Sequence, residues 1–221
     1  MIKVKALLDK RLGAVSGFIK GDVLVDVGTD HAKLPVRLCL ENKIKRAFAT
    51  DINKGPLAFA DALISENGLE DRIKTVLTNG LVGVDLSDVT DISVCGMGGE
   101  LISEILEQSF CLEYSRINFV LNPMTRDSEL RKYLFSRGFE IREETAVVQS
   151  GKVYAVIAAS FTGKVYEPTE TELMIGSIRG KNDAEKMYIE KALGRLRKQL
   201  KDKEKREKSE ILIKEIEEIL K

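Results

Sequence analysis

The chain has 221 residues, of which 43% are hydrophobic, enough for a substantial core in one domain or in one domain with an appendage. Its 35 basic residues balance its 35 acidic ones, which excludes binding to nucleic acid through an overall basic field and leaves only local clustering for that role. No apolar stretch approaches the roughly 20 residues that span a bilayer, and the first residues lack the apolar core of a signal peptide. These features predict a soluble, cytoplasmic protein with no membrane partner.

The cysteines are Cys39, Cys95 and Cys111, an odd number with no CxxC spacing. Two of them lie inside apolar runs. We therefore expect buried, unpaired thiols in a reducing compartment, with neither a structural disulfide nor a metal site.

The first three quarters of the chain predict an α/β fold. An N-terminal helix comes first, because four apolar residues fall on one helical stripe: Leu8, Leu12, Val15 and Ile19. Short apolar runs then alternate with helical segments. The predicted strands are residues 23–27, 46–50, 73–77, 92–95 and 117–121, and the predicted helices are 34–42, 57–67, 100–108 and 128–137. Such alternation predicts a parallel sheet covered on both faces.

Two extended runs follow the fifth strand. Residues 139–148 and 153–161 are rich in β-forming residues, and the QSGK between them offers Ser150-Gly151 as a tight hairpin turn. A Rossmann-like sheet that ends in an antiparallel hairpin is typical of class I methyltransferases. Ordinary nicotinamide-binding folds end differently.

The chain changes character near Tyr166, and from Glu170 onward the composition is that of solvated helices. Two narrow apolar seams of the coiled-coil kind are present, one made of Ile189, Leu193, Leu196 and Leu200 and the other of Ile213, Ile216 and Leu220. The KDKEKREKSE between them has no apolar residue, so the segment is either one long helix or a helical hairpin. We favour a hairpin with Ser209 or its neighbours near the turn, because each seam needs a partner. The predicted domains are therefore 1–165, the sheet domain, and 166–221, a helical coiled-coil domain.

The stretch VLVDVGTDHAKLP, residues 23–35, predicts a ligand site after the first strand. Asp26, Gly28 and Thr29 form the strand end that a nucleotide-like ligand needs, because glycine lets the backbone approach and the next helix offers free N–H groups. A pyrophosphate site would have a second glycine where Asp30 stands. S-adenosylmethionine, which carries positive charge and no phosphate, suits an acidic loop better. The alternative is a plain turn with Asp30 as a helix N-cap.

The second and third strands end in further polar residues. Asp51, followed by Ile52, is placed to accept hydrogen bonds from ribose hydroxyls. Asn79-Gly80 follows the third strand, where an amide could meet the edge of an adenine ring. Asn-Gly is above all a turn signature, however, so a simple turn is the alternative there.

The fourth strand ends in CGMGGE, residues 95–100. Gly96 and Gly98 on either side of Met97 predict a loop that permits close backbone contact at the carboxyl edge of the sheet, where open α/β folds bind ligands. The alternative is a flexible connection with Met97 as a core filler. Asn122, followed by proline, ends the fifth strand at the same edge.

These stretches together resemble one family. The strings KRLGAVSGFIKGDVLVDVGTDHAKLP, ATDINKGPLAFA, LTNGL, CGMGGELI and LRKYLFSRGFEI, in this order, are similar to the bacterial tRNA adenine-22 N1-methyltransferases. The resemblance runs from about residue 10 to residue 161, and the helical tail is similar in kind. It implies S-adenosylmethionine as cofactor and tRNA as partner. Family members commonly have aspartate where this chain has Asn79, and often glutamine where it has Asn122.

The chemistry that the resemblance implies makes few demands on side chains. N1 of neutral adenine has a free lone pair, so positioning is the main task. Methylation leaves the base cationic, and an acceptor for its exocyclic amino group would stabilise the transition state. Asp30 is the first such candidate and Asn122 the next; His31 could orient the base or the cofactor, and Met97 could pack on either. The alternative for His31 is packing at the helix N-terminus.

A basic strip in the tail is the predicted tRNA contact. Residues 195–208 hold eight basic and three acidic residues. The contacts that we expect come from Arg195, Arg197, Lys198 and Lys201 in the strip and from Lys10 and Arg11 near the first strand, which could also bind the cofactor's carboxylate. The alternative is a solvated helix face. A small-molecule methyltransferase and a non-catalytic RNA-binding module are the rival functions, and a monomer is favoured.

Overall fold

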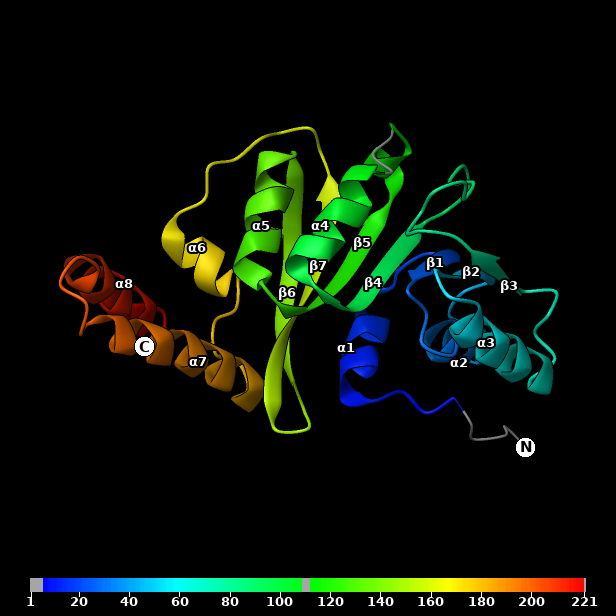
Figure 1. Ribbon diagram of the computed structural model, residues 1–221, viewed down its shortest axis with the longest axis horizontal. Helices are drawn as coiled ribbons and strands as arrows, with labels where there is room; N and C mark the ends of the chain where they lie inside the picture. Colours follow the sequence, from blue (N-terminus) through cyan, green and yellow to red (C-terminus); the bar gives the residue numbers. More distant parts are fainter. Residues whose placement is uncertain (1–5, 109–111, 221) are drawn as a thin grey trace.

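The computed structural model describes residues 6–108 and 112–220 and contains a seven-stranded sheet in the order β3-β2-β1-β4-β5-β7-β6 (Figure 1). The parallel strands are β1 (Val23–Val27), β2 (Arg46–Asp51), β3 (Ile73–Leu77), β4 (Asp91–Gly98) and β5 (Asn118–Thr125). The antiparallel strands are β6 (Phe139–Gln149) and β7 (Lys152–Phe161), with β7 paired to β5. The predicted α/β sheet with a terminal antiparallel hairpin is confirmed.

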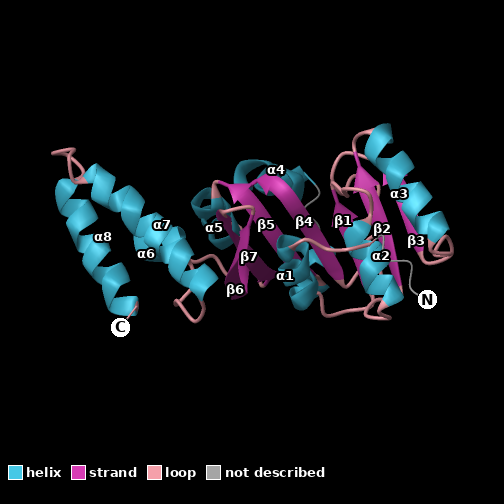
Figure 2. Cartoon of the chain, turned by 90° about the horizontal axis from the view of Figure 1, so that it is seen from below, coloured by secondary structure: helices cyan, strands magenta, loops and turns pink. Residues whose placement is uncertain are grey.

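Helices cover both faces of the sheet, as Figures 1 and 2 show. One face carries α1 (Lys10–Phe18), α2 (Lys33–Leu40) and α3 (Lys54–Glu66), and the other carries α4 (Gly99–Gln108) and α5 (Asp127–Ser136). A 3-10 helix, η1 (Leu112–Arg116), leads into β5. The five residues of β1 are all buried, because successive side chains enter opposite faces and both faces are covered.

The β6–β7 turn has the conformation that its sequence predicts. Ser150 and Gly151 have φ values of 51° and 71°, and two consecutive positive φ values match the right-handed twist of the flanking strands. The hairpin register follows, with Gln149 opposite Lys152.

The tail contains three helices: α6 (Glu170–Ile175), α7 (Asp183–Gln199) and α8 (Arg206–Ile219). The last two form a helical hairpin, as predicted, whereas α6, which begins at a Thr169 capping box, was not predicted (Figure 2). The predicted turn position was wrong: the chain turns between α7 and α8, and Ser209 is buried inside α8 with its hydroxyl 3.3 Å from Gln199 Oε1. The hairpin closes directly after the first seam ends.

The second apolar seam also differs from its prediction. Leu212 and Ile216 are buried, whereas Leu220 is 36% exposed. The early turn sets the antiparallel register of the hairpin. This register determines which apolar residues of the ILIKEIEEIL run are buried.

The tail shares a core with the sheet. Tyr188, Ile189 and Leu193 of α7 belong to the same buried cluster as Ala155 and Ile157 of β7. In the described part of the chain, no helix is both long and apolar enough to cross a membrane.

Candidate functional site

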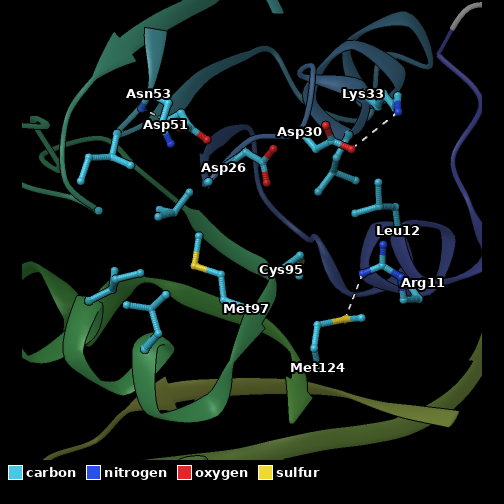
Figure 3. A pocket seen from close by; sticks show the side chains of 18 of the residues that line it. Arg11, Leu12, Asp26, Asp30, Lys33, Asp51, Asn53, Cys95, Met97 and Met124 are labelled. Atoms are coloured by element: carbon cyan, nitrogen blue, oxygen red, sulfur yellow. Dashed lines mark hydrogen bonds and ion pairs between the residues drawn. The ribbon is translucent and has the colours of Figure 1, made fainter. Parts of the chain in front are cut away.

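A cavity of about 620 Å³ lies at the carboxyl edge of the parallel strands (Figure 3). The loops after β1, β2 and β3 and the end of β4 supply most of its wall, and α1 closes one side. The glycine-rich stretch that was predicted to be a loop after the fourth strand is therefore the last part of β4 itself. The predicted site residues that line it are Arg11, Asp26, Gly28, Asp30, Asp51, Ile52, Asn79, Gly80, Gly96 and Met97. The parallel sheet thus brings four separate segments of the sequence to one place, and α1 adds a fifth.

Asp26 anchors the loop after β1. Its side chain is buried and accepts hydrogen bonds from Thr29 Oγ1 at 2.7 Å and from Ser93 Oγ at 2.6 Å. Burial raises the pKa of this carboxyl, an effect that the two hydroxyl donors partly offset. Thr29 is itself buried and faces Asp26 rather than the cavity, so it holds the loop in shape.

The two glycines Gly28 and Gly98 have different roles in the structure. Gly28 has a φ of +67°, and a Cβ on it would lie 2.0 Å from Cε of Met97, so the loop after β1 touches the end of β4 beneath the cavity. Gly98 does not line the cavity; a Cβ there would face Thr125 Oγ1 at 3.3 Å. Its backbone therefore packs against β5.

Asp51 ends β2 with its carboxyl group toward the cavity (Figure 3). Its Oδ1 accepts the Asn53 backbone N–H at 2.7 Å, which orients the group. Thr50 Oγ1 donates to the Gly80 carbonyl oxygen at 3.1 Å, and this bond ties the end of β2 to the loop that carries Asn79. A carboxylate held in this way is suited to accept hydrogen bonds from vicinal hydroxyls.

Asp30 stands at the mouth of the cavity with its side chain 76% exposed. Lys33 Nζ lies 3.7 Å from Oδ2, and His31 Nε2 lies 3.3 Å from Oδ1. Asp30 is not the helix N-cap: that position in α2 belongs to Ala32, and no side chain caps it. The N-cap alternative for Asp30 is therefore wrong.

His31 does not line the cavity. Its ring stacks on Phe59 of α3, with centroids 4.7 Å apart and planes within 5°. His31 and Ala32 both have left-handed φ values, 61° and 51°, and this turn directs the imidazole to the rim rather than inward.

Arg11 places a guanidinium group in the cavity wall from α1. Nη2 bonds to Asp9 Oδ2 at 2.9 Å, and Nη1 lies 3.3 Å from Asn122 Oδ1 and 3.4 Å from Met124 Sδ. Asn122 is fully buried beneath it and does not line the cavity, because its Nδ2 donates to the Ala155 carbonyl oxygen at 2.7 Å.

The remaining predicted residues lie elsewhere. Lys10 does not reach the cavity, and its backbone N–H bonds to Gln149 Oε1 at 3.1 Å. None of the four predicted tail cations lines this cavity: Arg195, Arg197, Lys198 and Lys201. Arg197 is held by Glu190 at 3.2 Å and by Glu217 at 3.1 Å.

Sequence reasoning missed several lining residues. These are Leu7, Asp9, Leu12, Lys33, Leu34, Asn53, Thr78, Leu101, Ile105 and Met124, with Val27 and Cys95 from the strands. Only Asn53, two residues after Asp51, had a local signal. The others come from helix faces and segment ends whose approach depends on the tertiary fold.

Two of the cysteines are free thiols. Cys39 is unpaired and buried and Cys95 is unpaired and partly buried, while Cys111 lies outside the described residues. Among the residues that the structure describes, no three His, Cys, Asp or Glu side chains are placed to hold a metal ion.

The donors and acceptors of the cavity fit a nucleoside joined to an amino acid. Asp51 offers an acceptor for ribose hydroxyls, Arg11 offers a cation for a carboxylate, and Leu101 and Ile105 offer apolar walls for a flat ring. Positive φ values at Gly28, Gly80 and Gly96 allow the backbone to approach such a ligand.

Comparison with known proteins agrees with this description. Residues 8–157 match the Methyltransferase domain family. The tRNA (adenine(22)-N(1))-methyltransferase of Bacillus subtilis is 31% identical over 153 residues, 69% of this chain and 64% of that enzyme, so the match spans a little under two thirds of the relative's length.

Solved structures are similar over almost the whole chain. A Streptococcus pneumoniae protein assigned to tRNA (m1A22) methylation, solved with S-adenosyl-L-methionine, is 30% identical with a TM-score of 0.82 over 97% of this chain and 100% of its own. The M. capricolum TrmK protein, solved with S-adenosyl-homocysteine, is 29% identical with a TM-score of 0.80 over 96% and 97%. With the family match, these likenesses identify the chain as a member of the methyltransferase domain family, in its tRNA (adenine-22 N1)-methyltransferase branch.

Proposed function

We propose that this protein transfers a methyl group from S-adenosylmethionine to N1 of adenine-22 in tRNA. The observation that carries the proposal is the cavity at the carboxyl edge, whose Asp51, Arg11 and glycine loops match the groups of that cofactor. The names of the similar proteins from Bacillus subtilis and Streptococcus pneumoniae supply the substrate. The proposal includes a cytoplasmic enzyme, which a tRNA substrate favours, and a monomer, which is supported by a cavity whose lining comes from one chain.

The residues of this chain would hold the cofactor by its polar ends. Asp51 accepts from the ribose, Arg11 pairs with the carboxylate, and Asn79 faces the adenine edge. Gly28, Gly80 and Gly96 let the backbone close around it, while Asp26 and Thr29 keep the first loop in shape. When bound, the cofactor supplies an electrophilic methyl group on a sulfonium.

The reaction needs little proton chemistry from the protein. N1 of adenine is already a free nucleophile, so the residues at the mouth of the cavity act by positioning. Asp30 accepts from the exocyclic amino group as the base becomes positive, which favours the transition state over the ground state. His31, stacked on Phe59 beside it, limits where Asp30 can move.

The test uses unmodified tRNA transcripts with adenine or guanine at position 22. We expect 1-methyladenosine in the digested nucleosides of the first transcript alone, and loss of most activity in Asp51→Ala. Equal methylation of both transcripts would mean that the enzyme methylates another position of the RNA. Cofactor binding without methylation of any RNA would favour a small-molecule substrate, and failure to bind the cofactor would favour a non-catalytic RNA-binding module.

A further inference from the structure

Two further cavities adjoin the cofactor cavity on the side of the tail. One of about 350 Å³ and one of about 760 Å³ share a wall made by the end of β5, the start of β7 and α7. We call this surface the α7 groove and define it by Met124, Lys152, Tyr154, Lys191 and Arg195. Met124 also lines the cofactor cavity, so the groove leads directly to it.

The groove carries positive charge that is not neutralised by the protein. Lys152, Lys191 and Arg195 are exposed and, within the described residues, form no ion pair with a carboxylate. Lys191 Nζ donates to the Val153 carbonyl oxygen at 3.2 Å, which fixes it along the edge of β7. Lys191 and Arg195 are four residues apart and therefore lie on the same face of α7.

The acidic residues that line the groove already have partners. Asp127 accepts a short hydrogen bond from the Tyr188 hydroxyl, and Glu129 lies 3.1 Å from Arg126. Glu190 lies 3.2 Å from Arg197. The surface that remains for a ligand is therefore cationic.

Tyr154 gives the groove a flat apolar face. Its side chain is half-buried on β7 opposite Val147, and its hydroxyl makes no hydrogen bond to the described residues. An aromatic ring that lies between cations suits the stacking of a nucleic acid base.

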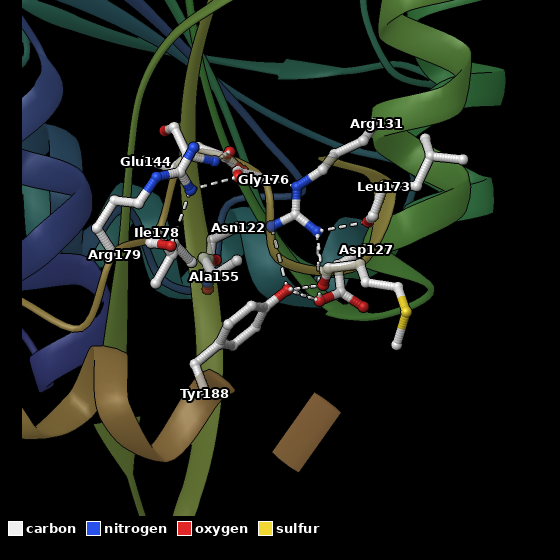
Figure 4. Close-up of polar contacts among 12 residues, drawn as sticks. Asn122, Asp127, Arg131, Glu144, Ala155, Leu173, Gly176, Ile178, Arg179 and Tyr188 are labelled. Carbon is white, nitrogen blue, oxygen red and sulfur yellow. Dashed lines mark hydrogen bonds and ion pairs between the residues drawn. The ribbon is translucent and has the colours of Figure 1, made fainter. Parts of the chain in front are cut away.

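A buried polar network fixes α7 relative to this surface (Figure 4). Arg131 of α5 is fully buried; its Nε lies 2.8 Å from Glu144 Oε1 and its Nη2 lies 3.0 Å from the Tyr188 hydroxyl. Tyr188 in turn donates to Asp127, the first residue of α5, which stands three residues after Met124 of β5. Tyr188 is three residues before Lys191, so the network sets which face of α7 borders the groove.

We propose that the α7 groove binds an unpaired strand of the substrate RNA next to the target nucleotide. This inference rests on the proposed function. Lys191 and Arg195 contact phosphates, and Tyr154 stacks on a base. The strand is unpaired because N1 lies on the Watson–Crick edge, which a methyltransferase reaches only after the base leaves its pair. The groove differs from the predicted basic strip, of which it contains only Arg195.

The charge test compares two double variants of the full chain. Lys191→Gln/Arg195→Gln removes two charges from the groove, and Lys186→Gln/Lys203→Gln removes two exposed charges from the tail outside it. Filter binding of the tRNA transcript over a salt series should show a log–log salt slope smaller by about 1.4 in the first variant, since each single-strand phosphate contact contributes about 0.7. The second should keep the wild-type slope.

The stacking test uses Tyr154→Ala and Tyr154→Phe. We expect the Kd for tRNA to rise about tenfold with alanine and to stay near the wild-type value with phenylalanine, which keeps the ring. Calorimetry with S-adenosylmethionine should give wild-type affinity for all four variants, which verifies that each is folded. Arg195→Gln alone, expected to lower the slope by about 0.7, serves if the double variant is unstable.

The two proposals fail in different ways. Equal weakening by both double variants, or wild-type binding by Lys191→Gln/Arg195→Gln and Tyr154→Ala in an enzyme that methylates A22, overturns the groove and leaves the function standing. Groove-dependent binding by a protein that methylates no tRNA supports the groove and overturns the function.

Discussion

Met97 and Gly28 are in direct contact beneath the cofactor cavity. A Cβ on Gly28 would lie 2.0 Å from Met97 Cε, and the backbone there has a φ of +67°. Gly28 follows β1 and Met97 lies near the end of β4, and these two strands are parallel neighbours in the sheet. The shape of the cavity floor therefore depends on the absence of a side chain at Gly28.

Gly28→Ala should lower the free energy of unfolding by about 1–2 kcal/mol, because an L-residue is strained in the left-handed region. It should also weaken S-adenosylmethionine binding, since the displaced end of Met97 occupies the cavity. Urea denaturation and calorimetry measure the two effects. Gly55→Ala is the control, because Gly55 lies in α3 with open space around it. This variant should lower neither the free energy of unfolding nor the affinity for S-adenosylmethionine.

A double-mutant cycle separates strain from crowding. In a Met97→Ala background, Gly28→Ala should still lower stability but should weaken cofactor binding less than it does alone. The same loss of affinity in both backgrounds would show that Met97 is not what the new methyl group displaces.

Asp51→Ala should weaken cofactor binding by about 1.5–3 kcal/mol, the range for a hydrogen bond to a charged group. Calorimetry measures the change, with Asp61→Ala on the exposed side of α3 as the control. Unchanged affinity in Asp51→Ala would place the ribose at another acceptor.

Asp30→Ala should slow methyl transfer at saturating substrates while the Kd for tRNA stays near the wild-type value. We expect about a tenfold loss, smaller than the roughly hundredfold for a water-excluded group, because this carboxylate is 76% exposed. Asp30→Asn keeps an acceptor, so its rate of methyl transfer should lie between the wild-type rate and that of Asp30→Ala. Single-turnover rates provide the measurement, and a wild-type rate in Asp30→Ala would transfer the role to nearby backbone carbonyls, because the other candidate, Asn122, is fully buried and outside the cavity.

Tyr188→Phe should lower the free energy of unfolding by about 1–3 kcal/mol, because it removes a partner of the buried Arg131 and of the partly buried Asp127. Tyr154→Phe, whose hydroxyl has no hydrogen-bond partner among the described residues, should change stability by less than about 0.5 kcal/mol. Urea denaturation compares them. Equal stability of the two variants would mean that the network does not hold the tail.

Cys95 should react slowly with thiol reagents. Burial, followed by the nearby Asp26, raises the pKa of this thiol well above its usual value. Because the thiolate is the reactive form, the modification rate at pH 8 should be low and should still be rising above pH 9. The measurement uses Cys111→Ser, with the urea-unfolded protein as the fast reference; fast modification of the folded chain at Cys95 would contradict the assignment.

The sequence alone determined the sheet and the residues at its carboxyl edge. Apolar runs of strand length alternating with helical stripes specify a parallel sheet, and parallel strands necessarily present Asp26, Gly28, Asp51 and Met97 at one edge. The hairpin turn was equally local, because Ser150-Gly151 supplies the positive φ values by itself. These features follow from neighbours in the chain.

Only the tertiary structure determined which residues far apart in the sequence come into contact around that edge. Arg11 meets Asn122 across 111 positions of sequence, and Arg131 meets Tyr188 across 57. The stacking of His31 on Phe59 likewise depends on how α2 and α3 pack. No local pattern encodes such pairs. Their positions follow from the way in which whole helices pack on the sheet, because the fit of the apolar faces determines which polar side chains meet.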